Sequence, residues 1–284
     1  MTPESNLFGN VVLESGICLP YNEGLAGGPS PKMSGKRIVT GGAVASSLLI
    51  TILYLVLQSH TNSLYLVSNI SEAAFSLVPL IIAVYLLKSR ELPFYKSTIC
   101  LTIGFFLWFL GEVIYSTYAL LLGVAIPYPS MADFFWLTGY WLVLLGMTLS
   151  IQPFRFAIKS QTLVLATVVS ITTSVLVAAY LVIPVIAISP DTATNMVGFA
   201  YPISDIALLF ASILGFLLFR GGKVARGWYL LVLGTLLFSV ADILFSFTTA
   251  KGTYFDGHPL ELLYDYGYVC FGLSLYSQLK VAWD

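Results

Sequence analysis

Seven carboxylic acids lie within the apolar segments of this sequence, and no Lys or Arg accompanies them there. A carboxylate buried in hydrocarbon without a partner costs on the order of several kcal/mol, so each acid must be protonated, bound to a cation or wetted by a cavity. Acids in such positions are suited to binding a proton, a cation or a small cationic ligand. The seven are Glu72, Glu112, Asp133, Asp205, Asp242, Glu261 and Asp265.

Aromatic and hydroxyl side chains share helix faces with several of these acids. Trp108, Glu112 and Tyr115 fall on one face by three- and four-residue spacing, and Tyr201 and Asp205 fall together on another. A stripe of this kind, repeated on several helices, predicts a polar cavity that faces the bundle axis. The candidate ligand- or cation-binding residues are Glu72, Glu112, Asp205, Asp242, Asp265, Trp108, Tyr115, Tyr201 and Tyr268.

A structural role is the alternative for each acid. Ser130 and Asp133 form a capping-box pattern at a helix start, and Glu261 follows another expected start at Pro259. Asp205 would cap a helix in the same way if that helix began at Pro202. The remaining acids, away from helix starts, could be neutral carboxyl groups that hydrogen-bond a neighbouring helix and hold the bundle together.

The elements that carry these residues are transmembrane helices. The chain has 284 residues, of which 58% are hydrophobic and 10% charged, with a mean hydropathy of +0.89. Continuous apolar runs of about 20 residues span the hydrocarbon layer as helices and lack the alternation of a barrel. The sequence predicts eight spans, at about 38–58, 64–87, 97–124, 131–151, 162–188, 197–219, 227–248 and 260–280.

The basic residues predict the orientation of the chain. All of the 13 Lys and Arg residues except Lys251 lie in the N-terminal tail, the even-numbered loops or the C-terminal end. The positive-inside rule then puts both termini in the cytoplasm, with the chain in the cell membrane. Residues 1–37, rich in Gly, Pro and Ser, are expected to form a flexible cytoplasmic tail. All seven acids would lie in the outer half of the membrane.

The second half of the chain repeats the first. Glu112-Val-Ile-Tyr-Ser corresponds to Asp242-Ile-Leu-Phe-Ser, and Gly139-Tyr corresponds to Gly267-Tyr, at a nearly constant offset along the chain. Similar offsets, of 133 and 128 residues, pair Glu72 with Asp205 and Asp133 with Glu261. Because four helices return a chain to its starting side, the two units, 38–151 and 162–280, should be parallel repeats. The predicted fold class is therefore all-α integral membrane, with eight transmembrane helices in two tandem parallel four-helix repeats.

Four short runs resemble a known kind of membrane region. They are Pro-Tyr-Pro-Ser-Met-Ala-Asp-Phe-Phe-Trp-Leu-Thr-Gly-Tyr at 127–140, Ala-Tyr-Pro-Ile-Ser-Asp at 200–205, Ala-Asp-Ile-Leu-Phe-Ser at 241–246 and Leu-Tyr-Asp-Tyr-Gly-Tyr at 263–268. Over about residues 70–280 the chain resembles the multi-spanning sensory regions that precede GGDEF and EAL domains in bacterial cyclic-di-GMP signalling proteins. The resemblance implies a signal-input module. Because no output domain follows here, it also implies either a module that works alone or a separate cytoplasmic signalling protein that reads the signal.

Enzyme signatures are few. The sequence has two histidines, His60 and His258, and no Cys pair, Walker loop or serine elbow. We therefore expect a non-enzymatic sensor or binding module with an outward-facing acidic cavity, no cofactor other than a possible bound cation, and no nucleic-acid partner. The alternatives are a cation- or proton-coupled transporter or channel, and a structural subunit that packs against other membrane subunits.

Overall fold

The computed structural model describes residues 33–88, 95–124, 126–177, 191–222 and 224–283. Within these ranges the chain forms eight α-helices and no strand. They are α1 (Met33–Leu57), α2 (Thr61–Leu87), α3 (Tyr95–Ser116), α4 (Met131–Ile151), α5 (Ser160–Val177), α7 (Thr192–Phe219), α8 (Ala225–Ala250) and α9 (Glu261–Trp283). A π-helical segment, Thr117–Leu122, extends α3, and a 3₁₀ segment, Gln152–Ala157, extends α4.

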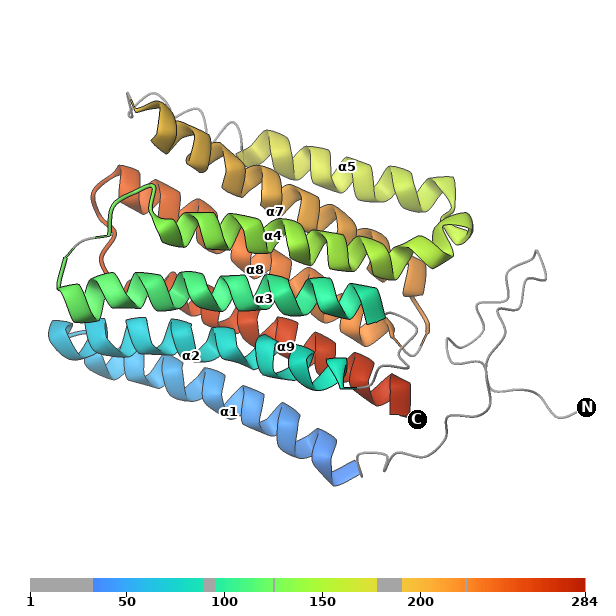
Figure 1. The fold of residues 1–284 in the computed structure, drawn as a ribbon, viewed down its shortest axis with the longest axis horizontal. Helices are drawn as coiled ribbons and strands as arrows, with labels where there is room; N and C mark the ends of the chain where they lie inside the picture. The colour runs from blue at the N-terminus through green and yellow to red at the C-terminus, as the bar shows by residue number, and fades with distance from the viewer. Residues whose placement is uncertain (1–32, 89–94, 125, 178–190, 223, 284) are drawn as a thin grey trace, which may run out of the picture.

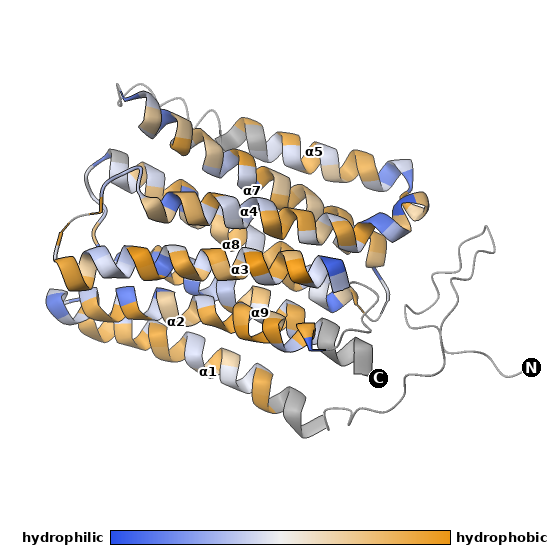
Figure 2. Cartoon of the chain, viewed as in Figure 1, coloured by the Kyte–Doolittle hydropathy of each residue, from blue (hydrophilic) through white to orange (hydrophobic). Residues whose placement is uncertain are grey.

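Six helices, α1, α2, α3, α4, α7 and α8, are long and apolar enough to cross a membrane. This confirms the all-helical fold class and indicates a multi-pass membrane protein. Figure 2 shows apolar residues along the length of these helices. On α1, Leu48, Leu49 and Ile52 are each more than half exposed, as expected of a helix whose outer face meets lipid. The apolar part of α5 is shorter within the described ranges, and α9, which carries two acids, is not among these six helices, so the spans expected for α5 and α9 remain predictions.

Six helices close into a ring. Helix α2 packs on α3, α3 on α4, α4 on α7, α7 on α8, α8 on α9, and α9 returns to α2. Outside the ring, α1 packs against α2 and α9, and α5 packs against α7, so that the two lie on opposite sides of the bundle (Figure 1). The acids of α9 are tolerated because this helix is enclosed by α1, α2 and α8 rather than by lipid.

The first residues of α4 and α7 confirm one predicted helix start and correct another. Helix α4 begins at Met131, as predicted, and Ser130 and Asp133 form the expected capping box. Helix α7, in contrast, begins at Thr192, where Asp191 is the N-cap and accepts a hydrogen bond from the Thr194 backbone N–H at 2.8 Å. Pro202 therefore lies inside the helix, and the alternative that Asp205 caps a helix start at Pro202 is wrong.

Two predicted segments fall partly outside the described ranges. Residues 1–32 of the expected tail lie outside them, and α1 already begins at Met33, within the last part of that tail. The fifth predicted span, 162–188, overlaps α5 as far as Val177, and its remainder also lies outside the described residues.

Candidate functional site

A cavity of about 640 Å³ opens at one end of the helix ring. This end contains the α3–α4 connection, the α8–α9 connection and the start of α7, and it lies opposite the end at which the chain terminates (Figure 1). All six ring helices contribute lining residues. The cavity lies within the range of about 300–1,000 Å³ that is usual for small-molecule sites.

The floor of the cavity is aromatic. Trp108 of α3 stacks on Phe238 of α8 with ring centroids 5.1 Å apart, and Tyr140 and Tyr268 meet these rings edge-on. Below this floor the ring interior is filled by buried apolar side chains such as Phe105, Phe271 and Met147.

Two glycines allow the floor to form. A Cβ atom on Gly139 would lie 2.4 Å from Cδ1 of Trp108, and a Cβ atom on Gly267 would lie 2.4 Å from Cδ2 of Phe238. Contacts this short are not tolerated by real side chains, so the bare backbones of α4 and α9 are what let the two rings seat against them. The indole N–H of Trp108 also donates to the Trp136 carbonyl at 3.0 Å, which fixes the orientation of the ring.

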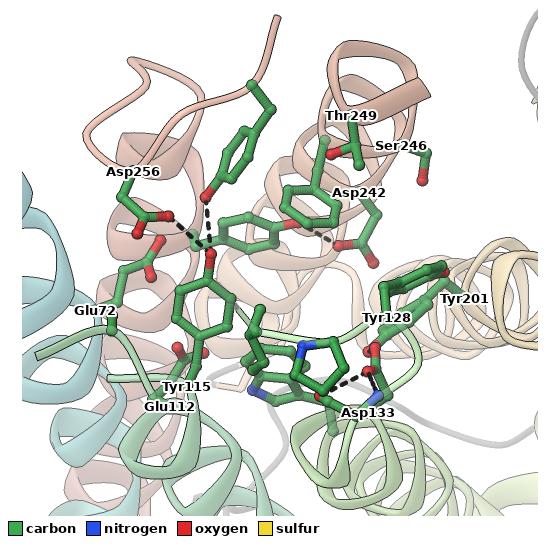
Figure 3. Close-up of a pocket in the computed structure, with 18 of the residues that line it drawn as sticks. Glu72, Glu112, Tyr115, Tyr128, Asp133, Tyr201, Asp242, Ser246, Thr249 and Asp256 are labelled. Atoms are coloured by element: carbon green, nitrogen blue, oxygen red, sulfur yellow. Dashed lines mark hydrogen bonds between the residues drawn. The ribbon is translucent and has the colours of Figure 1, made fainter. Parts of the chain in front are cut away.

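Five carboxyl groups line the walls, and no Lys, Arg or His is among the described residues that line the cavity. Carboxyl groups without a basic partner in such a space favour the binding of a cation, because a cation compensates the charge of their ionised form. Figure 3 shows the carboxyl groups facing the same space from several helices and from the α8–α9 connection. They belong to Glu72, Glu112, Asp133, Asp242 and Asp256.

Tyrosine hydroxyl groups hold four of these five carboxyl groups. Tyr268 donates to Glu112 at 2.6 Å, and Tyr115 donates to Asp256 at 2.8 Å. Both donors are on different helices or connections from their acceptors, so each bond also ties neighbouring segments together. Hydrogen bonds to a charged acceptor are roughly twice as strong as neutral ones, and a phenol O–H supplies this stabilisation without adding a positive charge.

The two other tyrosine-bound acids, Asp242 and Asp133, have further donors. Asp242 accepts from Tyr140 at 2.8 Å and from Tyr264 through its other oxygen. Asp133 accepts from Tyr201 at 2.9 Å, as well as from the Ser130 hydroxyl and backbone N–H. The predicted capping role of Asp133 is thus confirmed, and the same carboxyl also lines the cavity.

Glu72 differs from these four acids. It lines the cavity from α2, its side chain is half-buried, and it hydrogen-bonds no residue in the described part of the chain. Figure 3 shows it on the same side of the cavity as Glu112 and Asp256. Its acceptor capacity is therefore available to a ligand.

Seven of the nine residues predicted for the site line the cavity, and Asp205 and Asp265 do not. Asp205 is 5% exposed and lies within hydrogen-bonding reach of the Asp242 carboxyl. Asp265 is completely buried, and neither of its oxygens has a hydrogen-bond partner among the described residues. Both lie on ring helices that line the cavity, but their side chains are not part of the lining. The seven that line it are Glu72, Glu112, Asp242, Trp108, Tyr115, Tyr201 and Tyr268.

Glu261 also lies outside the cavity lining and has a structural environment. Its carboxyl accepts from the Gly257 backbone N–H at 3.0 Å, from Tyr54 at 2.8 Å and from Tyr254 at 2.9 Å. It therefore binds the connection that precedes α9, close to the capping role expected from the sequence.

Some lining residues were not predicted. Asp256 lies in the α8–α9 connection, outside the apolar runs in which the seven predicted acids lie. Tyr140 and Tyr264 could each have been predicted from the sequence. Tyr140 is the repeat counterpart of Tyr268, and Tyr264 shares a helix face with Tyr268.

In the α8–α9 connection, ionisation of the side chains responds to burial. Burial, reinforced by the charge of Glu261, raises the pKa of Tyr254 well above its usual range, so the phenol stays protonated and remains a donor. Burial also lowers the pKa of His258. Neither group therefore adds charge to this end of the protein near neutral pH.

Among the described residues, no group of three or more His, Cys, Asp or Glu side chains is arranged to hold a metal ion. What the cavity does offer is carboxyl groups around aromatic faces. This combination suits an organic cation, because an ammonium group gains from both the carboxylate charge and the ring quadrupole.

The described part of the chain thus defines an all-helical, multi-pass membrane protein with an acidic, aromatic-floored cavity at one end. No family model, curated protein or solved structure matches this chain.

Proposed function

We propose that this protein is a non-enzymatic, sensor-like membrane module that binds a small organic cation in its end cavity. The observation that carries the proposal is the composition of the lining: five carboxyl groups over an aromatic floor, with no basic side chain among the described lining residues. Tyrosine donors orient four of the acids and leave Glu72 without a hydrogen bond to any described residue.

We also propose that the chain has eight spans in two tandem parallel units. The pairings along the ring support this, because α2–α3–α4 and α7–α8–α9 pack in the same order, and α1 and α5 each flank the first helix of one such triplet. The cavity lining supports it too, because both members of five equivalent pairs contribute. These pairs are Trp108 with Phe238, Glu112 with Asp242, Tyr115 with Phe245, Trp136 with Tyr264, and Tyr140 with Tyr268.

An outward-facing cavity is favoured by the distribution of charge. Lys251 is close to the cavity end, whereas the opposite end of the described helices carries a set of basic residues, which the positive-inside rule assigns to the cytoplasm. Both termini would then be cytoplasmic, and the protein would lie in the cell membrane. The set comprises Lys88, Lys96, Arg155, Lys159, Arg220 and Arg226.

Binding fits the geometry better than transport. A carrier needs a polar route to both sides, yet the interior below the floor is packed with Phe105, Phe271 and Met147, each no more than 1% exposed. A purely structural role accounts for the tyrosine–carboxyl pairs that join helices, but it leaves the cavity itself and the unbonded carboxyl of Glu72 without a purpose.

The expected resemblance to sensory input regions suggests how binding would be used. A cation bound at the outer end would change the packing of the ring helices, and a separate cytoplasmic signalling protein or other membrane subunits would respond at the opposite end. The lipid bilayer is the remaining partner in this proposal.

Choline and its neutral isostere 3,3-dimethyl-1-butanol test the cation site. Isothermal titration of the detergent-purified chain should show binding of choline at least about tenfold tighter than of the alcohol, a difference of about 1.4 kcal/mol. Glu112→Gln combined with Asp242→Asn should abolish that preference. Equal affinities for both compounds in the unmodified chain, together with equal affinities for primary amines and their alcohols, would rule out the proposed site.

Transport is tested separately. Liposomes that contain the purified protein should show no protein-dependent uptake of radiolabelled choline. Saturable, protein-dependent uptake would show that the protein is a carrier and would overturn the proposed binding module.

A further inference from the structure

The acids of the cavity fall into two groups on opposite sides of the aromatic floor. The first subsite consists of Glu72, Glu112 and Asp256. Tyr115, which follows Glu112 on α3, donates to Asp256 at 2.8 Å and so links α3 to the α8–α9 connection. Figure 3 shows these three acids together on one side of the cavity, and Asp242 and Asp133 on the other.

The second subsite consists of Asp133 and Asp242. Tyr140 donates to Asp242 at 2.8 Å and meets Tyr201 edge-on, and Tyr201 donates to Asp133 at 2.9 Å. Two tyrosine rings in edge-on contact, each hydrogen-bonded to one of the acids, therefore join Asp133 and Asp242. This pair is separate from the Tyr115–Asp256 bond of the first subsite.

The floor lies between the two subsites. Trp108 precedes Glu112 by one helical turn on α3, and Phe238 precedes Asp242 by one turn on α8. Helices α3 and α8 lie opposite each other in the six-helix ring, so Glu112 and Asp242 approach the stacked Trp108–Phe238 pair from opposite sides. The arrangement is a short apolar strip with a negative group at each end.

We propose that the ligand of this cavity is a linear diamine, with one ammonium group at each subsite and its methylene chain over Trp108 and Phe238. The inference rests on the proposed cation site and specifies its ligand. An alkyl chain buries apolar area on the floor, and each ammonium has three donors to share among carboxyl oxygens. A monoamine of equal length would fill the same space but leave one acidic subsite without a positive partner, which is costly in a partly buried site.

Chain-length series test this directly. Isothermal titration of the full chain in detergent should compare α,ω-diamines of three to eight carbons with n-alkylamines of the same lengths. Diamines should bind at least about tenfold tighter than the monoamine of equal length, with a single optimum length, because only one span places both charges in their subsites.

Two variants connect the preference to the subsites. Glu72→Gln should reduce the diamine affinity toward that of the monoamine, and its fold should be preserved because Glu72 makes no hydrogen bond to any described residue. Asp191→Asn is the matched control, since Asp191 lies outside the cavity lining at the same end of the bundle and Asn remains a good N-cap. The control should retain the full preference for diamines.

The outcomes separate this inference from the proposed function. Equal affinities for diamine and monoamine at every length would overturn the two-subsite inference while leaving a simple cation site in place. A diamine preference that survives unchanged in Glu72→Gln and in Asp242→Asn would overturn it as well. Failure of choline and of every amine to bind would overturn both proposals.

Discussion

Replacing Tyr268 by Phe isolates the contribution of one tyrosine–carboxyl bond. The Tyr268 hydroxyl donates to Glu112 at 2.6 Å, and the two side chains are 1% and 6% exposed. Phe preserves the ring and its edge-on contact with Phe238, whose centroid lies 5.0 Å away. The substitution therefore removes a donor from a buried carboxyl group and changes little else.

The expected loss is about 1–2 kcal/mol in the free energy of unfolding. Hydrogen bonds to charged groups contribute about 1.5–3 kcal/mol in soluble proteins, whereas interhelical bonds in membranes average about 0.6 kcal/mol. The intermediate value follows because the carboxyl is buried but borders a cavity that can admit water. Tyr140→Phe should cost less, because Asp242 retains a second donor, Tyr264, after Tyr140 is changed.

Equilibrium unfolding in mixed detergent micelles measures these differences. Tyr229→Phe is the matched control, since Tyr229 is 55% exposed on α8, and it should alter stability by less than about 0.5 kcal/mol. A double-mutant cycle with Glu112→Gln should give a coupling energy of about 1 kcal/mol. If Tyr268→Phe unfolds at the same denaturant concentration as Tyr229→Phe, the Tyr268 hydroxyl does not stabilise the Glu112 carboxyl.

Three further predictions concern packing, capping and pH. Gly139→Ala should destabilise the bundle by about 1–3 kcal/mol and shift Trp fluorescence, because the added Cβ would overlap Trp108. Gly41→Ala is the control and should be neutral or stabilising, because a Cβ at Gly41 has nothing within 4 Å. Equal thermal stability of the two variants would contradict the packing of Trp108 on Gly139. Ser130→Ala should cost about 1 kcal/mol in thermal unfolding through loss of the capping box, and Ser130→Thr should restore most of it; an unchanged midpoint for Ser130→Ala would argue against the cap. Hydrogen bonds from the Thr194 hydroxyl and backbone N–H lower the pKa of Asp191, so its contribution to stability is present above the unfolded-state pKa of about 3.9 and is lost as pH falls through the lower folded-state value. Thermal unfolding between pH 6 and pH 3 should consequently show a shallower loss of stability at the acid end for Asp191→Asn, and identical profiles would refute the assignment.

The sequence predicted the helices well because hydrocarbon imposes a simple rule. The span expected at 131–151 coincides with α4, and the capping box at Ser130 marks where it begins. The span at 197–219 was predicted to begin a few residues too late, because the N-cap, Asp191, lies upstream in a polar run. The alternative start at Pro202 arose because Pro is common in the first turn of a helix. A Pro inside a membrane helix is tolerated when neighbouring helices surround it, and local sequence does not report those neighbours.

The site was predicted in part for a related reason. Trp108, Glu112 and Tyr115 share a helix face that does point into the cavity. Asp265 has the same kind of neighbours on α9, yet it is completely buried beside the cavity, because α9 is enclosed on most sides and its sequence contains no apolar stripe to fix its rotation. Asp256 was not predicted, because an acid in a polar connection is ordinary and the sequence does not indicate that the connection folds over a cavity.

The closure of the helix ring by α2 and α9 has a consequence for biosynthesis. Helix α2 is made early, whereas α9, one of its two ring neighbours, is synthesised after the other five ring helices. Until α9 arrives, the flank of α2 that packs on α9 faces acyl chains or a temporary neighbour. A nascent chain stalled before α9 should therefore be the form that insertion factors hold and quality-control proteases remove.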